Sequence, residues 1–370
     1  MKRWQITSKF KRFNSRRSSK SLKKLSAKKS HSTTTRIKNR KSQISPTIRP
    51  QKIKELTDTH HHYISSHKPI AVPEDFRLLN NTSQCLKFFK KLRSRGVIKH
   101  MGNQKRVAIT LANVEHIDYA AISVFRSIVE EMSKRHIGIS GDFPKDTECK
   151  RMIIRSGFLH KMYDKFNRPF PRHSKSDIHF FEKGSGKMTE SDGKILSSTM
   201  NSVASDLMDK PTKCSMLKSL LMEICGNTIE WSEATDKQWM LGIIYDDDRV
   251  TITVTDVGKG ILHTLIGKFR LLFESMSKTD VEILYGAFEQ KYGSKSKDVN
   301  RNQGLRLVKW FHDDKCVKEL KVLTNNVLLD FSNPTNSVDF SSRGIDFEGT
   351  FYQWELDKEC IDNINNNSWN

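Results

Sequence analysis

The sequence predicts an α/β protein with two folded parts that follow a long basic tail. Segments with strand and helix patterns alternate over residues 76–165 and again after about residue 190, as in sheets covered by helices. The length of 370 residues also suggests two domains. We therefore expect a basic tail over 1–70, a first α/β domain over 71–165, a linker over 166–189, a second α/β domain over 190–360 and a polar C-terminal tail over 361–370.

The N-terminal tail carries most of the net charge of +22. Residues 1–54 contain nineteen Lys and Arg and no Asp or Glu, whereas the rest of the chain has 45 basic against 42 acidic residues. Apolar residues are isolated in this segment, so it cannot bury enough surface to offset its ordering entropy, and we expect it to be disordered. Its charge predicts DNA or RNA as a partner. An anionic membrane, an acidic protein or no specific partner are the alternatives.

Composition also indicates a cell compartment. No run of 18 or more apolar residues exists, so no transmembrane segment is expected, and the N-terminus lacks the apolar stretch of a secretory signal. It shares the basic, Ser-rich, acid-free composition of an organellar transit peptide, without a clear amphipathic repeat. The six cysteines are scattered without a C-x-x-C pair, which favours free thiols in the cytoplasm. The His-rich segment 58–63 is interpreted as a loop rather than a metal site.

The first domain follows a recognisable order of elements. We predict helices over 83–96 (with Gly96 as the C-cap), 119–135 and 146–158, and strands over 106–114 and 136–142. This order around "HIDYAAIS" resembles the STAS fold of anti-sigma antagonists and transporter tails. In phospho-regulated members a Ser follows the Asp at the strand-to-helix turn, but here Tyr119 follows Asp118 and Ser123 lies further along. A docking or dimerising module therefore fits better than a phospho-switch.

The second domain contains a helix with an unusual polar face. In "LLMEICGNTIEW", Glu223 and Asn227 are four residues apart, and Glu230 follows at a spacing of three. Such spacings place side chains on one helical face. Taken alone, this pattern is more typical of an amphipathic surface helix with a solvated acidic edge.

Further motifs follow along the chain. Two antiparallel strands are predicted over 239–256, joined near Asp246–Asp248, and the second ends in a D-x-G-x-G motif. Its glycines permit turns and a close approach of the main chain to a ligand, although a simple Gly-rich turn is the alternative. About 40 residues later Gly304 opens a predicted helix in "GLRLVKWF", whose first N–H groups favour phosphate. Finally, "GTFYQWEL" places Gly349 and Thr350 at the start of a terminal strand. "GSGK" at 184–187 lacks the other positions of a P-loop.

Each motif is weak alone, but their order and spacing resemble those of the GHKL ATPases. This family includes histidine kinases, type II topoisomerases, mismatch-repair ATPases and anti-sigma kinases. The resemblance covers about residues 190–358. It implies a Bergerat α/β sandwich, with helices on one face of a mixed sheet.

The resemblance also implies roles for particular residues. Asn227 would coordinate Mg²⁺ that bridges the phosphates of ATP, and Glu223 would orient or deprotonate the attacking water or hydroxyl group. The segment 262–303 would form the ATP lid. The remaining cofactor-binding residues would be Asp256 (adenine amino group), Gly258 and Gly260 (adenine pocket), Gly304 (backbone amides to phosphate) and Thr350 (near the adenine).

The chain departs from the family pattern in three places. The usual second glycine of G-x-G-L is Arg306, which would either supply charge to the γ-phosphate or face solvent. Glu230-Trp231 stands where kinase-like members often carry His. No phosphoacceptor His signature precedes the domain, which argues against an autophosphorylating sensor kinase. Lys295 and Lys297 are interpreted as solvated lid charges rather than phosphate ligands.

The sequence therefore predicts an Mg²⁺-dependent ATP-binding regulatory protein. We expect a slow ATPase whose lid closure controls contact with a second copy or with a regulatory protein partner. One alternative is a Ser/Thr protein kinase of the anti-sigma kind. Another is a nucleic-acid-associated ATPase tethered through residues 1–54, and a nucleotide sensor without hydrolysis is a third.

Overall fold

The computed structural model describes residues 68–101, 104–160, 162–170, 178–182, 189–231, 238–274, 278–292 and 303–367. The chain divides into two units, 1–53 and 54–370, and every described residue belongs to the second. Residues 1–67 of the predicted disordered tail, which include the His-rich segment 58–63, lie outside the described residues, as do Lys295 and Lys297. The predicted boundary at residue 70 is wrong, because Ile70 is buried and begins the strand Ile70–Ala71 (β1).

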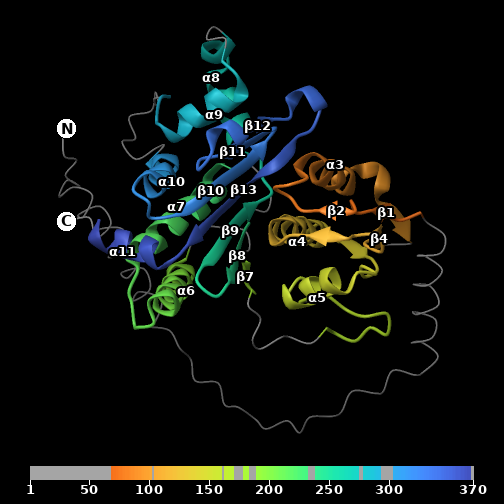
Figure 1. Ribbon diagram of the computed structural model, residues 1–370. Helices are drawn as coiled ribbons and strands as arrows, with labels where there is room; N and C mark the ends of the chain where they lie inside the picture. Colours follow the sequence, from red (N-terminus) through yellow and green to blue (C-terminus); the bar gives the residue numbers. More distant parts are fainter. Residues whose placement is uncertain are drawn as a thin grey trace, which may run out of the picture. The chain divides into compact units, whose positions relative to one another are not determined.

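The second unit is an α/β structure, as predicted (Figure 1). Its helices are α3 Thr82–Arg93, α4 Tyr119–Lys134, α5 Thr147–Arg155, α6 Glu190–Met208, α7 Ser215–Trp231, α8 Ile261–Glu274, α9 Asp280–Phe288, α10 Gln303–Asp313 and α11 Lys358–Asn366. Its strands are β1 Ile70–Ala71, β2 Asp75–Phe76, β3 Lys99–Met101, β4 Gln104–Thr110, β5 His116–Ile117, β6 Ile137–Ser140, β7 Ile178–Glu182, β8 Trp239–Tyr245, β9 Val250–Asp256, β10 Lys318–Asn325, β11 Val327–Asp330, β12 Val338–Asp339 and β13 Phe347–Leu356. Across the described residues, no helix combines the length and apolar character needed to cross a membrane.

Residues 70–155 build a small mixed sheet with helices packed on it. Strand β4 pairs in parallel with β1 and β6 and antiparallel with β3. The helices predicted over 119–135 and 146–158 are present as α4 and α5. Helix α4 begins where the Asp118 side chain accepts a hydrogen bond from Ala121 N at 2.7 Å, as an N-cap residue does.

The prediction that Gly96 caps the first of these helices is wrong. Helix α3 ends at Arg93, and Ser94 takes an extended conformation (ψ 142°) while its amide bonds to Lys91 O. Gly96 lies in a separate 3-10 turn, Arg95–Val97. Because Ser94 stops the helix with ordinary extended backbone, no glycine is needed there.

A seven-stranded sheet forms the second half, in the order β12-β11-β10-β13-β9-β8-β7. All its strand pairs among the described residues are antiparallel, so the expected mixed sheet is wrong for this part. The position of β13 explains why the pairing is antiparallel throughout these strands. Strands β9 and β10 run in the same direction, and they would form a parallel pair if they were neighbours. The terminal strand β13 lies between them and pairs with both.

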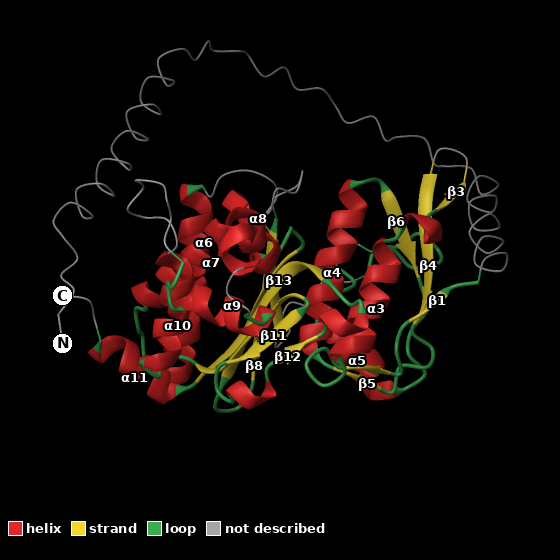
Figure 2. Cartoon of the chain, turned by 90° about the horizontal axis from the view of Figure 1, so that it is seen from above, coloured by secondary structure: helices red, strands yellow, loops and turns green. Residues whose placement is uncertain are grey.

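Both faces of this sheet are covered by helices (Figures 1 and 2). Along β9, Val250, Ile252 and Val254 join one core with residues of α6 and α7. The alternate residues Thr253 and Thr255 face α4, where their hydroxyls lie 3.1 and 3.2 Å from Ser123 Oγ. This alternation is the period of two expected of a strand. The resemblance implied helices on one face only, so the covering of the second face by residues 119–134 is a difference.

The predicted boundaries at the linker and at the C-terminus also differ from the elements. Strand β7 lies inside the segment 166–189 and pairs with β8 at the edge of the sheet. The polar tail expected from residue 361 is wrong for residues 361–366, which belong to α11 and bury Ile361 and Ile364. The helical spacing of these two apolar residues packs them on the core despite the polar composition around them.

Candidate functional site

Helix α7 carries the polar face that the sequence singled out. Its apolar residues Leu220, Leu221 and Ile224 are buried in the core beneath the sheet. Glu223 is exposed and Asn227 is half-buried. The helix is therefore amphipathic, with both predicted residues on its accessible edge.

Helix α10 brings its first turn against that edge. A methyl group placed on Gly304 would lie 2.5 Å from Asn227 Nδ2 and 3.2 Å from Glu223 Oε2. Both distances are shorter than ordinary contacts, so glycine lets the α10 backbone approach these two side-chain ends without displacing them. Three of the predicted residues, from two helices far apart in sequence, therefore meet at one place.

A second group of predicted residues lies at the end of β9. Asp256 is 8% exposed and pairs with Thr350 on β13 and with Trp239 on β8. Its Oδ1 accepts a hydrogen bond from Gly258 N at 2.9 Å, so the carboxylate holds the start of its own loop. Asp256, Gly258 and Thr350 thus form one cluster.

Helix α7 links the group at Gly304, Glu223 and Asn227 with the cluster around Asp256. Its Cys225 is buried against the sheet, and burial raises the pKa of this thiol well above its ordinary value, with a further increase from the charge of Asp256. The pKa of Tyr352, on the neighbouring strand, is raised by burial and then by the same carboxylate. One side of α7 therefore lies near Asp256, while its accessible edge carries Glu223 and Asn227.

The loop after Asp256 is shaped by residues that the sequence did not indicate. Gly260 has a positive φ of 80°, and a methyl group there would collide with the side-chain amide of Asn325. Asn325 and Thr324 stand at the end of β10, both fully buried. No motif marks these two residues. Only the pairing of β10 with β13, which the sequence does not reveal, places them beside the loop.

The remaining predicted residue, Arg306, contacts the segment after α9. Its side chain is exposed and its Nη1 donates to Gln290 Oε1 at 3.1 Å, just beyond the end of α9. Of the expected lid, helices α8 and α9 are described, whereas 275–277 and 293–302 lie outside the described residues. Glu230 also belongs to α7, but its side chain is not among those described.

One cavity of the described structure lies away from the predicted site residues. A cavity of about 660 Å³ lies in the first half of the unit, and its lining contains none of the predicted site residues. Among the described residues, no group of three or more His, Cys, Asp or Glu side chains is arranged to hold a metal ion. Mg²⁺ usually takes only one or two protein oxygens, supplemented by phosphate and water, so it does not require such a group.

Comparison with known proteins adds no information about function. No protein-family model matches this chain, and a search of curated proteins finds no match.

Proposed function

We propose that the chain binds ATP with Mg²⁺ in a site of the GHKL type and acts as a slow ATPase with a regulatory role. The observation that carries the proposal is the close approach of Gly304 to Glu223 and Asn227. A glycine at a helix start beside an amide and a carboxylate suits a phosphate chain and its metal ion. By the same proposal, the seven-stranded sheet with α6, α7 and α10 is a Bergerat sandwich, and residues 70–155 are a STAS-like module.

The phosphate end of the site would be formed by α7 and α10. Asn227 would hold Mg²⁺, which neutralises phosphate charge when it is bound. The first turn of α10 would direct N–H groups toward the phosphates. Glu223, which is exposed beside Gly304, would orient or deprotonate an attacking water.

The adenine end would be formed by the cluster around Asp256. The carboxylate already accepts one hydrogen bond from Gly258 N, and its second oxygen can accept one from the exocyclic amine of adenine. Thr350, directly opposite Asp256 on β13, is placed to contribute a hydroxyl. Arg306 would approach phosphate only by leaving Gln290, so its proposed contribution is secondary.

Regulation would depend on a partner, either a second copy of the chain or another protein. A protein kinase of the anti-sigma kind would transfer phosphate to a partner hydroxyl instead of water. Ser123, the serine that follows Asp118 and Tyr119 in the STAS-like segment, is fully buried between α4 and β9, so a kinase would need an acceptor elsewhere. A nucleic-acid-associated ATPase is the third possibility, with residues 1–54 as the tether.

The experiment measures ATP binding and phosphate release separately. Asn227→Ala should lose Mg²⁺-dependent ATP binding, whereas Glu223→Ala should bind ATP and lose about 10²–10⁴-fold in turnover, as expected for removal of a general base. Glu190→Ala, on the exposed surface of α6, is the matched control and should behave as the wild type. Failure of the wild-type protein to bind ATP would overturn the proposal, and labelled partner protein in place of released phosphate would indicate the kinase.

A further inference from the structure

Two buried polar side chains at the end of β10 hold the loop that follows Asp256. Asn325 Nδ2 donates to Lys259 O at 2.8 Å, and its Oδ1 accepts from His263 N at 3.2 Å. Asn325 itself has a φ of 51°, a left-handed conformation that Asn tolerates better than most residues. One side chain therefore fixes both the loop before α8 and the first turn of that helix.

The neighbouring threonine completes this arrangement. Thr324 Oγ1 accepts from Ile261 N at 2.9 Å and donates to Gly349 O at 3.0 Å. Gly349 directly precedes Thr350, which is the register partner of Asp256. Through one hydroxyl, the start of α8 is tied to the strand that faces Asp256.

These contacts also occupy donors at the start of α8. The first N–H groups of a helix have no partner within the helix and are the usual donors to phosphate. In α8, two of these donors, those of Ile261 and His263, already bond to Thr324 and Asn325. The first turn of α10 lies instead against Glu223 and Asn227, which hold the phosphate end of the site in the proposed function.

We propose that Thr324 and Asn325 are positioning residues of the nucleotide site, an inference that rests on the proposed function. They fix the loop 257–260 around the adenine and withdraw the start of α8 from phosphate binding, so that the phosphate chain is directed to α10. Neither residue needs to contact the nucleotide to do so.

The test uses the full chain and three substitutions. Thr324→Val keeps the shape of the side chain and removes the hydroxyl. Asn325→Gly removes the side chain while permitting the left-handed backbone. Thr253→Val is the matched control, because it also removes a buried strand hydroxyl, one that contacts Ser123 instead of the loop. Two quantities are measured, the Kd for ATP with Mg²⁺ and, without nucleotide, the hydrogen exchange of the Ile261 and His263 amides.

The two loop variants should exchange these amides faster and bind ATP about tenfold more weakly, which corresponds to loss of one hydrogen-bonded contact. Thr253→Val should change neither quantity. If the loop variants exchange faster but bind ATP as the wild type does, or if Thr253→Val weakens binding equally, the inference is overturned while the proposed function stands. If wild-type protein binds no ATP, the proposed function falls, and this inference with it.

Discussion

If the proposed function holds, the lack of a side chain at Gly304 should matter for nucleotide binding more than for folding. A methyl group there would press on Asn227 Nδ2 and Glu223 Oε2, which are the ends of side chains that can move. Inside a helix, alanine is also about 0.5–1 kcal/mol more favourable than glycine. Gly304→Ala should therefore keep or slightly raise the free energy of unfolding, yet displace both side chains and weaken ATP binding by tenfold or more, about 1.4 kcal/mol.

The matched control is Gly226→Ala, one residue before Asn227, where a methyl group would meet no atom within 4 Å. It should leave ATP binding unchanged. Denaturant unfolding and ATP titration on both variants check the prediction. Equal ATP affinity in Gly304→Ala and Gly226→Ala would mean that the contact with α7 is unrelated to nucleotide binding.

The sequence revealed some of these residues and not others for a physical reason. Glu223 and Asn227 are four apart on one helix, so local geometry alone places them together. Gly304 lies far beyond Asn227 in the chain, and only the analogy with a family order suggested their meeting. Thr324 and Asn325 act through a strand pairing that leaves no mark in local sequence, so the residues that cap α8 could not be predicted.

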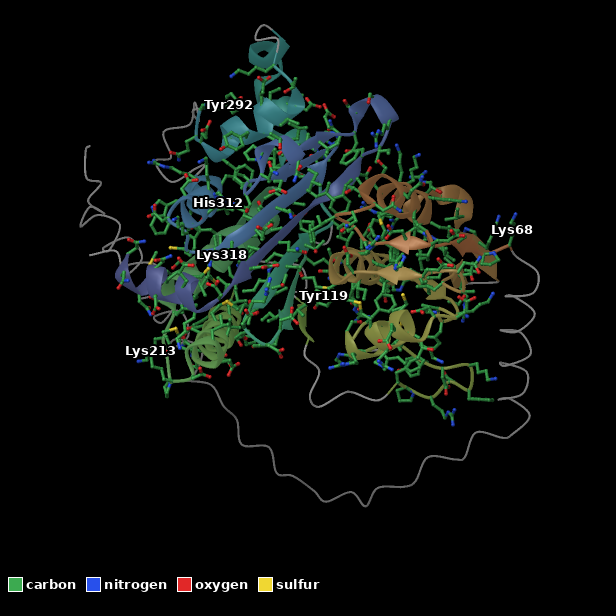
Figure 3. All side chains as sticks on the ribbon, in the orientation of Figure 1. Lys68, Tyr119, Lys213, Tyr292, His312 and Lys318 are labelled. Carbon is green, nitrogen blue, oxygen red and sulfur yellow. The ribbon has the colours of Figure 1, made fainter. Side chains whose placement is uncertain are left out.

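Among the elements, α11 shows how a segment of polar composition is held in the folded structure. Its N-cap Asp357 accepts from Cys360 N at 2.9 Å and from Lys318 Nζ at 2.6 Å, and Lys318 lies at the start of β10 (Figure 3). Burial acts to raise the pKa of Asp357, but the bonds from Lys318 and Cys360 prevail and hold this pKa below its ordinary value. The ionised form is therefore favoured in the folded state.

The lowered pKa of Asp357 determines how the free energy of unfolding changes with pH. A carboxyl group whose pKa is lowered by folding stabilises the protein above its unfolded pKa, and this contribution is lost as the pH falls through the folded pKa. Asp357→Asn keeps a capping side chain but loses the charge. At pH 7 it should reduce the free energy of unfolding by about 1 kcal/mol, because solvent screens the part-exposed ion pair.

The difference between the wild type and Asp357→Asn should shrink below about pH 4, where this carboxyl group begins to take up its proton in the unfolded chain, and should vanish as the pH falls through the lower folded pKa. Urea unfolding at about pH 7, 5 and 3.5 measures it. A difference that stays constant over this range would show that the charge of Asp357 has no part in stability.

The contact between α4 and β9 gives a second prediction about how elements stabilise the fold. Ser123 is fully buried with its Oγ near the hydroxyls of Thr253 and Thr255, and Tyr119 marks the start of this helix beside the sheet (Figure 3). Ser123→Ala should cost about 1 kcal/mol, the usual value of one hydrogen bond. Ser123→Asp would bury a carboxylate without a cation and should cost about 3 kcal/mol or more.

Denaturant unfolding of the two Ser123 variants compares these costs. Similar small losses for both substitutions would mean that α4 leaves the sheet easily and that Ser123 is accessible. The same measurement bears on the alternative kinase hypothesis, because an accessible Ser123 would be an internal phosphate acceptor.

In the molecule as a whole, residues 70–155 and the seven-stranded sheet share a core. Phe76, Phe89 and Phe125 of the first half belong to the same buried cluster as Leu323 and Phe351 of the sheet. The sequence predicted the α/β class and most elements, because periodicity is local. It could not predict this shared core. In β9, threonines alternate with Val and Ile just as they do in a strand with one face in water. The sequence of this strand therefore does not indicate that α4 covers the threonine face.

The shared core leads to a prediction for the second unit. Deletion of residues 1–53, none of which contributes to the described core, leaves both halves of this core in the protein. The shortened protein should unfold in one cooperative transition with the midpoint of the full chain, because cores that share buried side chains cannot lose one half without exposing the other. Calorimetry, with far-UV circular dichroism and tryptophan fluorescence as independent probes, measures it.

A fragment that begins at residue 178 should, in contrast, be poorly folded. It keeps every strand of the larger sheet but uncovers Leu323, Phe347 and Phe351, which pack against the first half in the whole chain. Exposed apolar surface of this kind favours association between copies, so the fragment should self-associate and melt below the shortened protein. A monomeric fragment with the full melting temperature, or two separate transitions in the shortened protein, would mean that the halves fold independently. In that case the cover of α4 over β9 would be a docking contact that can open, and regulation of the nucleotide site through that contact would become the next hypothesis to test.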